Sequence, residues 1–268
     1  AALALSGCAT ATPTETASPS ESETALATLT PGKLTIGTGL PAYEPWVVGD
    51  APESGEGFEA AVAYAVAEQL GFAAEDVVWV RTTFDEAIAP GAKNFDFNLQ
   101  QYSITDERKA SVDFSSPYYE TTQTIITVEG SKAAGATTIA ELKDLAIGAA
   151  TGTTSFAAIE EVIQPTGGAK AFNSNDDAKA ALAAGQIDAL VVDLPTALYL
   201  TAVEIDGGVI VGQLAGALAG DQFGLVLDKG SALTAAVTAA VDALRADGTL
   251  AALAEQWLSG YAGVPVLE

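Results

Sequence analysis

Residues 95–119 restrict the fold more than any other stretch of this chain. The apolar run Phe95–Leu99 indicates a buried strand, and Ser103, Thr105 and Arg108 follow it. Open α/β sheets bind their ligands at the carboxyl ends of strands. An arginine fork fits a carboxylate in two parallel hydrogen bonds. The stretch therefore predicts an α/β protein with an anion-binding group at a strand end, or, alternatively, a helix cap beside a surface arginine.

The rest of the chain alternates short apolar runs with helical periodicity, which also indicates an α/β fold. One run, Val77–Val80, is apolar throughout and predicts a strand covered on both faces. Other strands are expected at residues 34–37, 121–129, 146–149, 187–192, 209–212 and 221–227. Helices are expected at residues 58–70, 84–88, 156–163, 178–184 and 231–246, from Pro195, and around Leu250 to Trp257.

The run Ser103–Lys109, followed by Val112–Tyr119, resembles extracytoplasmic solute-binding proteins of family 3, the amino-acid-binding components of ABC importers. In that family a hydroxyl residue precedes Ile-Thr-x-x-Arg-Lys and then Asp-Phe-Ser-x-Pro-Tyr-Tyr. The resemblance extends from Leu34 to Trp257. It implies a two-lobed, type II periplasmic-binding-protein-like fold, with two crossing hinge strands and a ligand cleft between the lobes.

On this basis we expect three regions in the chain. Residues 1–30 would hold a signal-peptide remnant, a lipidation site and a disordered linker. Residues 31–127 plus 222–268 would form a discontinuous first lobe, and residues 128–221 would form the second lobe. The protein is expected to be a monomer.

The resemblance implies a set of ligand-binding residues in the first lobe. Two of them have alternatives: Trp46 could be a packing plug under its loop, and Phe84 could start a helix and pack inward. Family members tend to have small residues at the positions of Gln100 and Gln101, so these amides, with Tyr102, would narrow the pocket. The implied residues are Tyr43, Trp46, Phe84, Gln101, Ser103 and Arg108.

The second lobe would supply Thr153, Thr154, Ser155 and Asp193. Hydroxyls and N–H groups at a helix start form an anion site, which the resembled family uses against the ligand carboxylate. An Asp at the position of Asp193 pairs with the ligand ammonium in the family. Ordinary helix capping is the alternative for each of these residues.

The segment Leu3–Cys8 looks like the end of a bacterial lipoprotein signal peptide. Acyl chains on Cys8 would anchor the protein to the outer face of the cell membrane; a chance free Cys is the alternative. Residues 9–30 lack aromatic residues and are expected to be a disordered tether. No other stretch approaches the apolar length of a spanning helix.

The charge excludes several functions. The chain has 35 acidic and 11 basic residues, a formal net charge of -24, and would repel nucleic acids and anionic lipids. It has no His, which excludes imidazole chemistry, and one Cys, which excludes an internal disulfide. We expect no cofactor or metal, no nucleic acid partner, and membrane attachment through the lipid anchor alone.

We therefore expect an extracytoplasmic, lipid-anchored binding protein, not an enzyme, that delivers an amino acid to an ABC transporter permease. Family members that bind basic side chains commonly place an acid in the first loop, where this chain has Gly39, Leu40 and Pro41, which favours a polar, uncharged or aromatic-compatible ligand. Glu44 is the acid that could overturn this preference. Alternatives of the same fold are dehydratases of cyclic acids, similar to cyclohexadienyl dehydratase, and sensor ectodomains.

Overall fold

The computed structural model describes residues 26–215, 220–258 and 263–268. Cys8 and most of the expected tether lie outside the described residues. The end of the expected tether belongs to the folded body, contrary to the prediction. Leu26 packs against the core of the first lobe, and the Leu29 N–H donates a hydrogen bond of 2.8 Å to Asp96.

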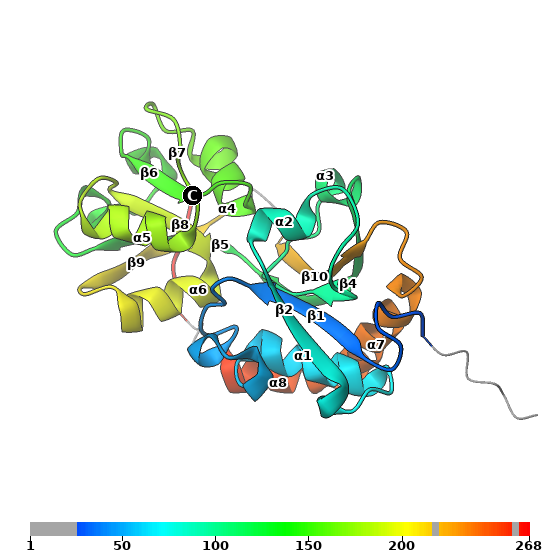
Figure 1. Cartoon of the computed structure of the whole chain (residues 1–268). Coiled ribbons are helices and arrows are strands. Elements are labelled where there is room, and N and C mark those ends of the chain that lie inside the picture. Colours follow the sequence, from blue (N-terminus) through cyan, green and yellow to red (C-terminus); the bar gives the residue numbers. More distant parts are fainter. Residues whose placement is uncertain (1–25, 216–219, 259–262) are drawn as a thin grey trace, which may run out of the picture.

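The described strands form two sheets, one in each lobe (Figure 1), as the predicted two-lobed α/β fold requires. The first sheet has the order β2-β1-β3-β10-β4. β1 is parallel to β2 and β3, whereas β10 is antiparallel to β3 and β4. Its strands are β1 (Leu34–Gly39), β2 (Val77–Thr82), β3 (Phe97–Asn98), β4 (Val112–Thr121) and β10 (Asp221–Asp228).

Helices α1, α7 and α8 pack together on one side of the first sheet, and α2 and α3 lie toward the other side (Figure 1). Phe58, Val62 and Val66 of α1 are buried in the core, as their spacing predicts. The helical elements of this lobe are η1 (Val48–Asp50), η2 (Pro52–Ser54), α1 (Phe58–Gln69), η3 (Ala74–Asp76), α2 (Phe84–Ile88), α3 (Asp106–Lys109), α7 (Thr234–Ala246) and α8 (Thr249–Trp257).

The second sheet has the order β11-β9-β5-β8-β6-β7. The strands β6, β7 and β8 run parallel, and β5 is antiparallel to both of its neighbours. Its strands are β5 (Gln123–Val128), β6 (Ile147–Ala150), β7 (Lys170–Phe172), β8 (Ala189–Asp193), β9 (Gly208–Leu214) and β11 (Val266–Leu267).

Two helices of the second lobe change their winding partway. The helix predicted at residues 156–163 is an α-helix that continues as a π-helix, and the helix after Asp193 does the same. The helical elements are η4 (Lys132–Gly135), η5 (Ile139–Leu142), α4 (Thr154–Ala158), η6 (Ile159–Ile163), α5 (Asn175–Ala183), α6 (Leu194–Tyr199) and η7 (Leu200–Glu204).

The chain passes between the lobes where β4 is followed by β5 and where β9 is followed by β10. The first passage lies at Thr121–Gln123, because all of β5 pairs within the second sheet. The expected boundary after residue 127 was therefore several residues too late. The chain also returns after α8: β11 pairs with β9, and its end is seen with the second lobe (Figure 1). Assigning all of 222–268 to the first lobe was thus wrong for its last residues.

Strand β2 is covered less completely than expected, and it forms an edge of the first sheet. Its side chains are mostly half-buried, and Val78 is exposed. Val77 and Trp79 pack against the core on one face of the strand, and Val80 packs against a second cluster on the other face. The apolar run therefore reflects partial cover on both faces.

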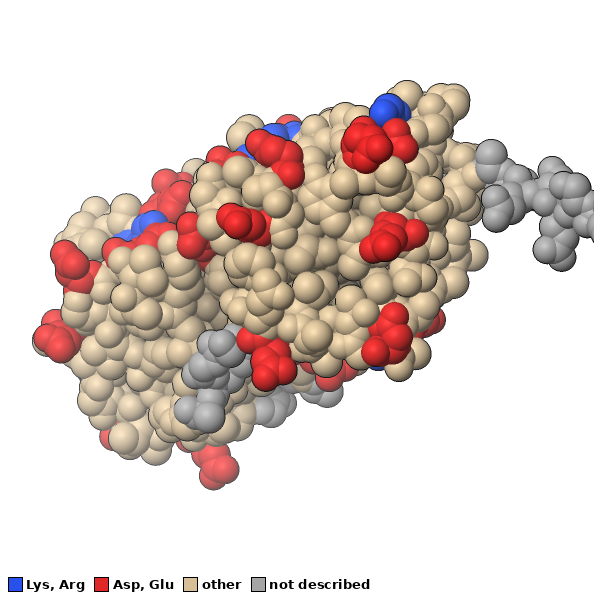
Figure 2. Space-filling view, turned by 90° about the horizontal axis from the view of Figure 1, so that it is seen from below, with Lys and Arg blue, Asp and Glu red and all other residues tan. Residues whose placement is uncertain are grey.

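Acidic side chains are spread over the surface, with few basic ones among them, on the face shown in Figure 2. Such a face disfavours contact with polyanions. No helix among the described residues has the length and apolar character needed to cross a bilayer.

Candidate functional site

A cavity of ≈ 280 Å³ lies between the lobes. Its lining comes from both sheets' strand ends and from the loops that follow them, the place where α/β proteins bind small molecules. All the predicted pocket residues line it, namely Tyr43, Trp46, Phe84, Gln101, Ser103, Arg108, Thr153, Thr154, Ser155 and Asp193. Their role in binding stays a prediction.

Arg108 is held in place by both lobes. Its helix begins at Thr105, whose hydroxyl accepts the Arg108 N–H, so the predicted cap is present. The side chain is not on the surface, however, because Arg108 is only 9% exposed. Its guanidinium donates to the Ser103 carbonyl at 2.7 Å and, across the cleft, to the Gly152 carbonyl at 2.9 Å. Burial lowers the pKa of this guanidinium, which nevertheless stays a cation.

Phe84 supports this cation. The guanidinium carbon of Arg108 lies 5.3 Å from the centre of the Phe84 ring, within cation–π range. Tyr102 packs against the same ring at a centroid distance of 4.5 Å, and its hydroxyl donates to the Phe84 carbonyl. Tyr102 is fully buried and is not part of the cavity lining, so the expectation that it narrows the pocket was wrong. Tyr102 instead fixes Phe84 from behind.

Asp193 ends β8 and caps α6. Its carboxylate accepts the Thr196 N–H at 3.1 Å and the Thr196 hydroxyl at 3.0 Å, so the capping alternative is present in the structure. The same residue lines the cavity. Burial raises the pKa of its carboxyl to about 6, with a further rise from nearby Asp221 and an opposing effect of the hydrogen bonds from Thr196. Capping and a cavity role therefore coexist.

The start of α4 joins the lobes through hydroxyl groups. Thr153 caps the helix by accepting the Phe156 N–H. The Thr154 hydroxyl lies 3.1 Å from the Ser103 hydroxyl of the first lobe and donates to Asp221 at 3.0 Å. Asp221 also accepts a hydrogen bond from Gln123, beside the first passage between the lobes. Ser103, Thr154 and Asp221 thus connect the cavity with the hinge.

The loop between β1 and α1 closes one side of the cavity. The Tyr43 hydroxyl donates to Asp176 at 3.2 Å, and the Trp46 indole N–H donates to the Thr196 hydroxyl at 3.0 Å; both acceptors are in the second lobe. Trp46 is also 1% exposed and packs edge-on against aromatic rings, so it is a packing plug as well.

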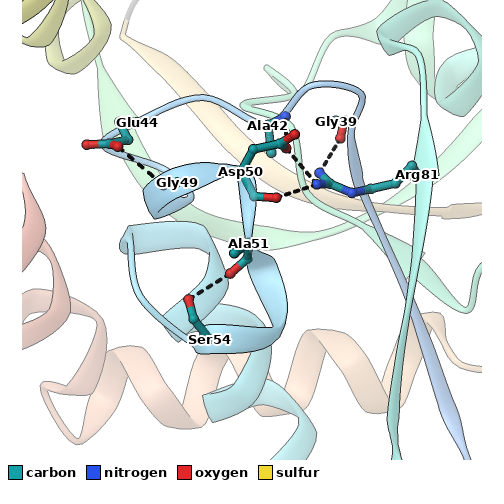
Figure 3. A network of polar contacts seen from close by, with 8 residues as sticks. All are labelled: Gly39, Ala42, Glu44, Gly49, Asp50, Ala51, Ser54 and Arg81. Atoms are coloured by element: carbon teal, nitrogen blue, oxygen red, sulfur yellow. Dashed lines mark hydrogen bonds and ion pairs between the residues drawn. The ribbon is translucent and has the colours of Figure 1, made fainter.

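Glu44 points elsewhere. It is not part of the cavity lining, and its carboxylate accepts the Gly49 N–H at 3.2 Å, as Figure 3 shows. The acid that could have changed the expected ligand preference therefore lies outside the cavity.

Glu59 is a cavity residue that the sequence reasoning missed. It is 2% exposed and accepts hydrogen bonds from the Tyr118 hydroxyl, the Gln101 N–H at 2.8 Å and the Gln101 amide at 2.5 Å. Burial raises the pKa of its carboxyl to about 7, although these hydrogen bonds lower it, and Asp193 raises it further. Its place in the first turn of α1, next to buried Phe58, was the available signal.

Gln100 and Gln101 both line the cavity, but each is tied to the first lobe. The Gln100 amide donates to Thr82 and Asn98 at 2.8 and 3.0 Å. Gln101 has a left-handed backbone, φ 52°, and its side chain pairs with Glu59. Both amides thus serve as fixed walls of the cavity.

The lining combines one buried guanidinium with carboxylates and hydroxyls, a set that can hold a small molecule carrying both charges. No group of three or more acidic or Cys side chains within the described residues could hold a metal ion.

The chain resembles known proteins over most of its length. Residues 34–260 match the model of the bacterial extracellular solute-binding proteins, family 3. The L-arginine-binding protein of Pseudomonas aeruginosa is 31% identical over 225 residues, which cover 81% of this chain and 85% of that protein.

Two solved structures share the fold. An ancestral arginine-binding protein bound to arginine has a TM-score of 0.71 and 31% identity, over 85% of this chain and 99% of the other. The ancestral amino acid-binding protein AncCDT-1, a precursor of cyclohexadienyl dehydratase, has a TM-score of 0.69 and 30% identity, and the match covers 85% of this chain and 96% of that one. The chain therefore belongs to the bacterial extracellular solute-binding proteins of family 3.

Proposed function

We propose that the cavity binds an amino acid by its two charged ends. The ligand carboxylate would take the guanidinium of Arg108 and the N–H and hydroxyl groups of Thr153–Ser155, and its ammonium would take Asp193. The observation that carries this proposal is that Arg108 and Asp193, from different lobes, line one cavity. The amino acids named for the similar proteins described above agree with this ligand class.

Closure of the lobes would follow from this arrangement. Neither lobe alone offers both the cation and the carboxylate of the proposed clamp, so a zwitterion gains its full set of contacts in the closed form alone. The contacts from Arg108 to Gly152 and from Ser103 to Thr154 already join the lobes here. We infer that ligand binding stabilises this closed arrangement.

We further propose that the protein is the extracytoplasmic component of an ABC importer. It would be anchored through lipid on Cys8 to the outer face of the cell membrane, act as a monomer, and deliver the amino acid to a membrane permease. The lipoprotein-like segment before Cys8 and the polar residues after it support the anchor. Labelling of growing cells with a palmitate analogue, compared between the wild type and Cys8→Ser, would test it.

A dehydratase is the second candidate, and Glu59 is the observation that favours it. A carboxyl with a pKa near 7 in a cavity has the property of a general acid. Glu59 is, however, already bonded to Tyr118 and Gln101, which holds it as part of the wall. We therefore favour binding without turnover, and expect no product from a cyclohexadienyl substrate in an assay followed to completion.

The proposed binding function is tested by thermal shift and calorimetry with the common amino acids and L-cystine. At least one amino acid should raise the unfolding temperature and bind in a one-to-one ratio. Its analogues without the ammonium or the carboxylate should fail to do so. A chain that binds none of these ligands would contradict the proposal.

A further inference from the structure

Residues 40–50, which we call the closing loop, follow β1, end with η1 and form one wall of the cavity. Leu40, Pro41, Ala42 and Val47 line the cavity beside Tyr43 and Trp46. The closing loop also contacts the second lobe through the hydrogen bonds of Tyr43 and Trp46. Its conformation therefore affects both the shape of the cavity and the fit of the lobes.

The middle of the closing loop is held by helix α1. The N–H groups of Phe58 and Glu59 donate to the carbonyls of Pro45 and Trp46 at 3.0 and 2.9 Å. These donors have no partner within their own helix, because the first N–H groups of a helix never do. The helix thus fixes the middle of the closing loop but leaves both of its ends to other contacts.

Arg81 of β2 holds the two ends together, as Figure 3 shows. Its guanidinium donates to the carbonyl of Gly39, where β1 ends, at 2.6 Å. It also donates to the carbonyl and the carboxylate of Asp50, each at 2.6 Å. The Asp50 carboxylate in turn accepts the Ala42 N–H at 2.8 Å. A single planar fork therefore connects Gly39, just before the closing loop, with Asp50, the last residue of the loop.

This geometry differs from an ordinary surface ion pair. An isolated exposed pair contributes little stability, because water and salt screen it. Arg81 is partly buried, with its side chain 27% exposed, and it also satisfies two backbone carbonyls. Arg81 is not among the residues that line the cavity, so its effect on a ligand is indirect, and its side-chain hydrogen bonds go to Gly39 and Asp50.

We propose that Arg81, with Asp50, is a positioning residue that keeps the closing loop in the form in which Tyr43 and Trp46 meet the second lobe. This inference rests on the proposed function for its effect on ligand affinity, but its effect on the loop is independent of any ligand. Lysine cannot reproduce the role fully, because one ammonium lacks the rigid fork that reaches both ends.

The first experiment needs no ligand. Hydrogen exchange of the amides of residues 40–47, apart from Pro41 and Pro45, is compared among the wild type, Arg81→Gln and Arg245→Gln. Arg245 is an exposed arginine of α7 that pairs with Asp242 and donates to the Pro117 carbonyl, away from the closing loop. Exchange should be about tenfold faster in Arg81→Gln, most clearly at Ala42, and unchanged in Arg245→Gln. Equal exchange in all three proteins would overturn the proposal.

The second experiment measures affinity by calorimetry, with L-arginine, L-glutamine and L-cystine as probes. For a probe that the wild type binds, Arg81→Gln should weaken binding about tenfold through faster dissociation, with Arg81→Lys intermediate and Arg245→Gln unchanged. The double variant Arg81→Gln/Asp50→Asn should lose little more than either single variant. Unchanged affinity in Arg81→Gln, or additive losses, would contradict the proposal.

The two experiments separate the failure of this inference from that of the proposed function. Absence of binding in the wild type would reject these probes as ligands, while the exchange experiment would still decide the role of Arg81. If Arg81→Gln and Arg245→Gln unfold at comparable temperatures, a loss of affinity in Arg81→Gln alone does not come from a general loss of stability. The loss then belongs to the closing loop.

Discussion

The guanidinium of Arg108 donates a hydrogen bond of 2.9 Å to the carbonyl of Gly152, so a side chain of the first lobe is bonded to the backbone of the second. Gly152 has φ +72° and directly precedes the capping residue of α4. The contact thus brings the cation next to the start of that helix. It makes Arg108 both the proposed ligand anchor and a link between the lobes.

Replacing Arg108 by Met should abolish amino-acid binding. The variant removes the charge and leaves the partners of the guanidinium without a donor, which costs about a hundredfold or more in affinity. Arg108→Lys keeps the charge but not the fork, and should bind only slightly better than Arg108→Met. Calorimetry gives the affinities and circular dichroism the folded state. Wild-type affinity in Arg108→Met would remove Arg108 from the site.

Asp193→Asn should weaken binding of an amino acid by about tenfold to a hundredfold, while the helix it caps stays formed, because Asn is an equally good N-cap. The loss should be much smaller for the ligand's analogue without an ammonium group. Competition between the two ligands measures this difference. Equal losses for both would show that Asp193 acts by capping alone.

The folded protein should become less stable as the pH rises from about 4.5 to 7. The pKa of Glu59 is raised from 4.5 to about 7, so the folded state binds a proton that the unfolded state releases. The stability gained from this proton is complete below pH 4.5 and is lost as the pH rises from 4.5 to about 7, and it amounts to about 3 kcal/mol.

Chemical unfolding of the wild type and Glu59→Gln at several pH values measures this dependence. The Gln variant cannot release the proton and should show a flatter profile over the same range. Asp193 adds a smaller slope of the same sign at lower pH, because its pKa is raised to about 6. Identical profiles for the two proteins would mean that Glu59 is ionised in the folded state at all these pH values.

Gly57→Ala should destabilise the protein and loosen the closing loop. Gly57 has φ +103°, and a Cβ atom there would come within 2.5 Å of the Trp46 carbonyl oxygen. Gly71→Ala is the matched control, since Gly71 has φ +84° but open space around it. The control should cost about 1 kcal/mol from backbone strain and Gly57→Ala clearly more. Equal unfolding temperatures of Gly57→Ala and Gly71→Ala would show that the closing loop accommodates the added methyl group without a loss of stability.

Much of the site was predictable because its residues follow strands. Ser103 follows the apolar run Phe95–Leu99 in the first lobe, and Asp193 ends β8 in the second. The carboxyl ends of these strands face the cleft between the lobes, so both residues line the cavity. Glu59 was missed because it lies on a helix, one residue after Phe58. Nothing in a helical pattern separates an acid facing a cavity from one facing water, unless its partners Tyr118 and Gln101 are known.

The boundaries were less predictable, because they depend on pairing between distant segments. The position of the first passage depends on how β5 pairs with β8 and β9. The return of Val266–Leu267 to β9 has no local signal, because a two-residue strand has no periodicity. Edge position of β2 likewise follows from the strand order and not from its own residues.

The return of β11 to the second lobe has a practical consequence. Leu29 is bonded to Asp96 in the first lobe, Val266 belongs to the second, and both side chains point to solvent, with 54% and 55% exposed. The variant Leu29→Cys/Val266→Cys, with Cys8 replaced by Ser, would carry one fluorescent dye on each lobe. The efficiency of energy transfer between the dyes would change when the two lobes open or close. The labelled protein would therefore report ligand-induced closure by fluorescence.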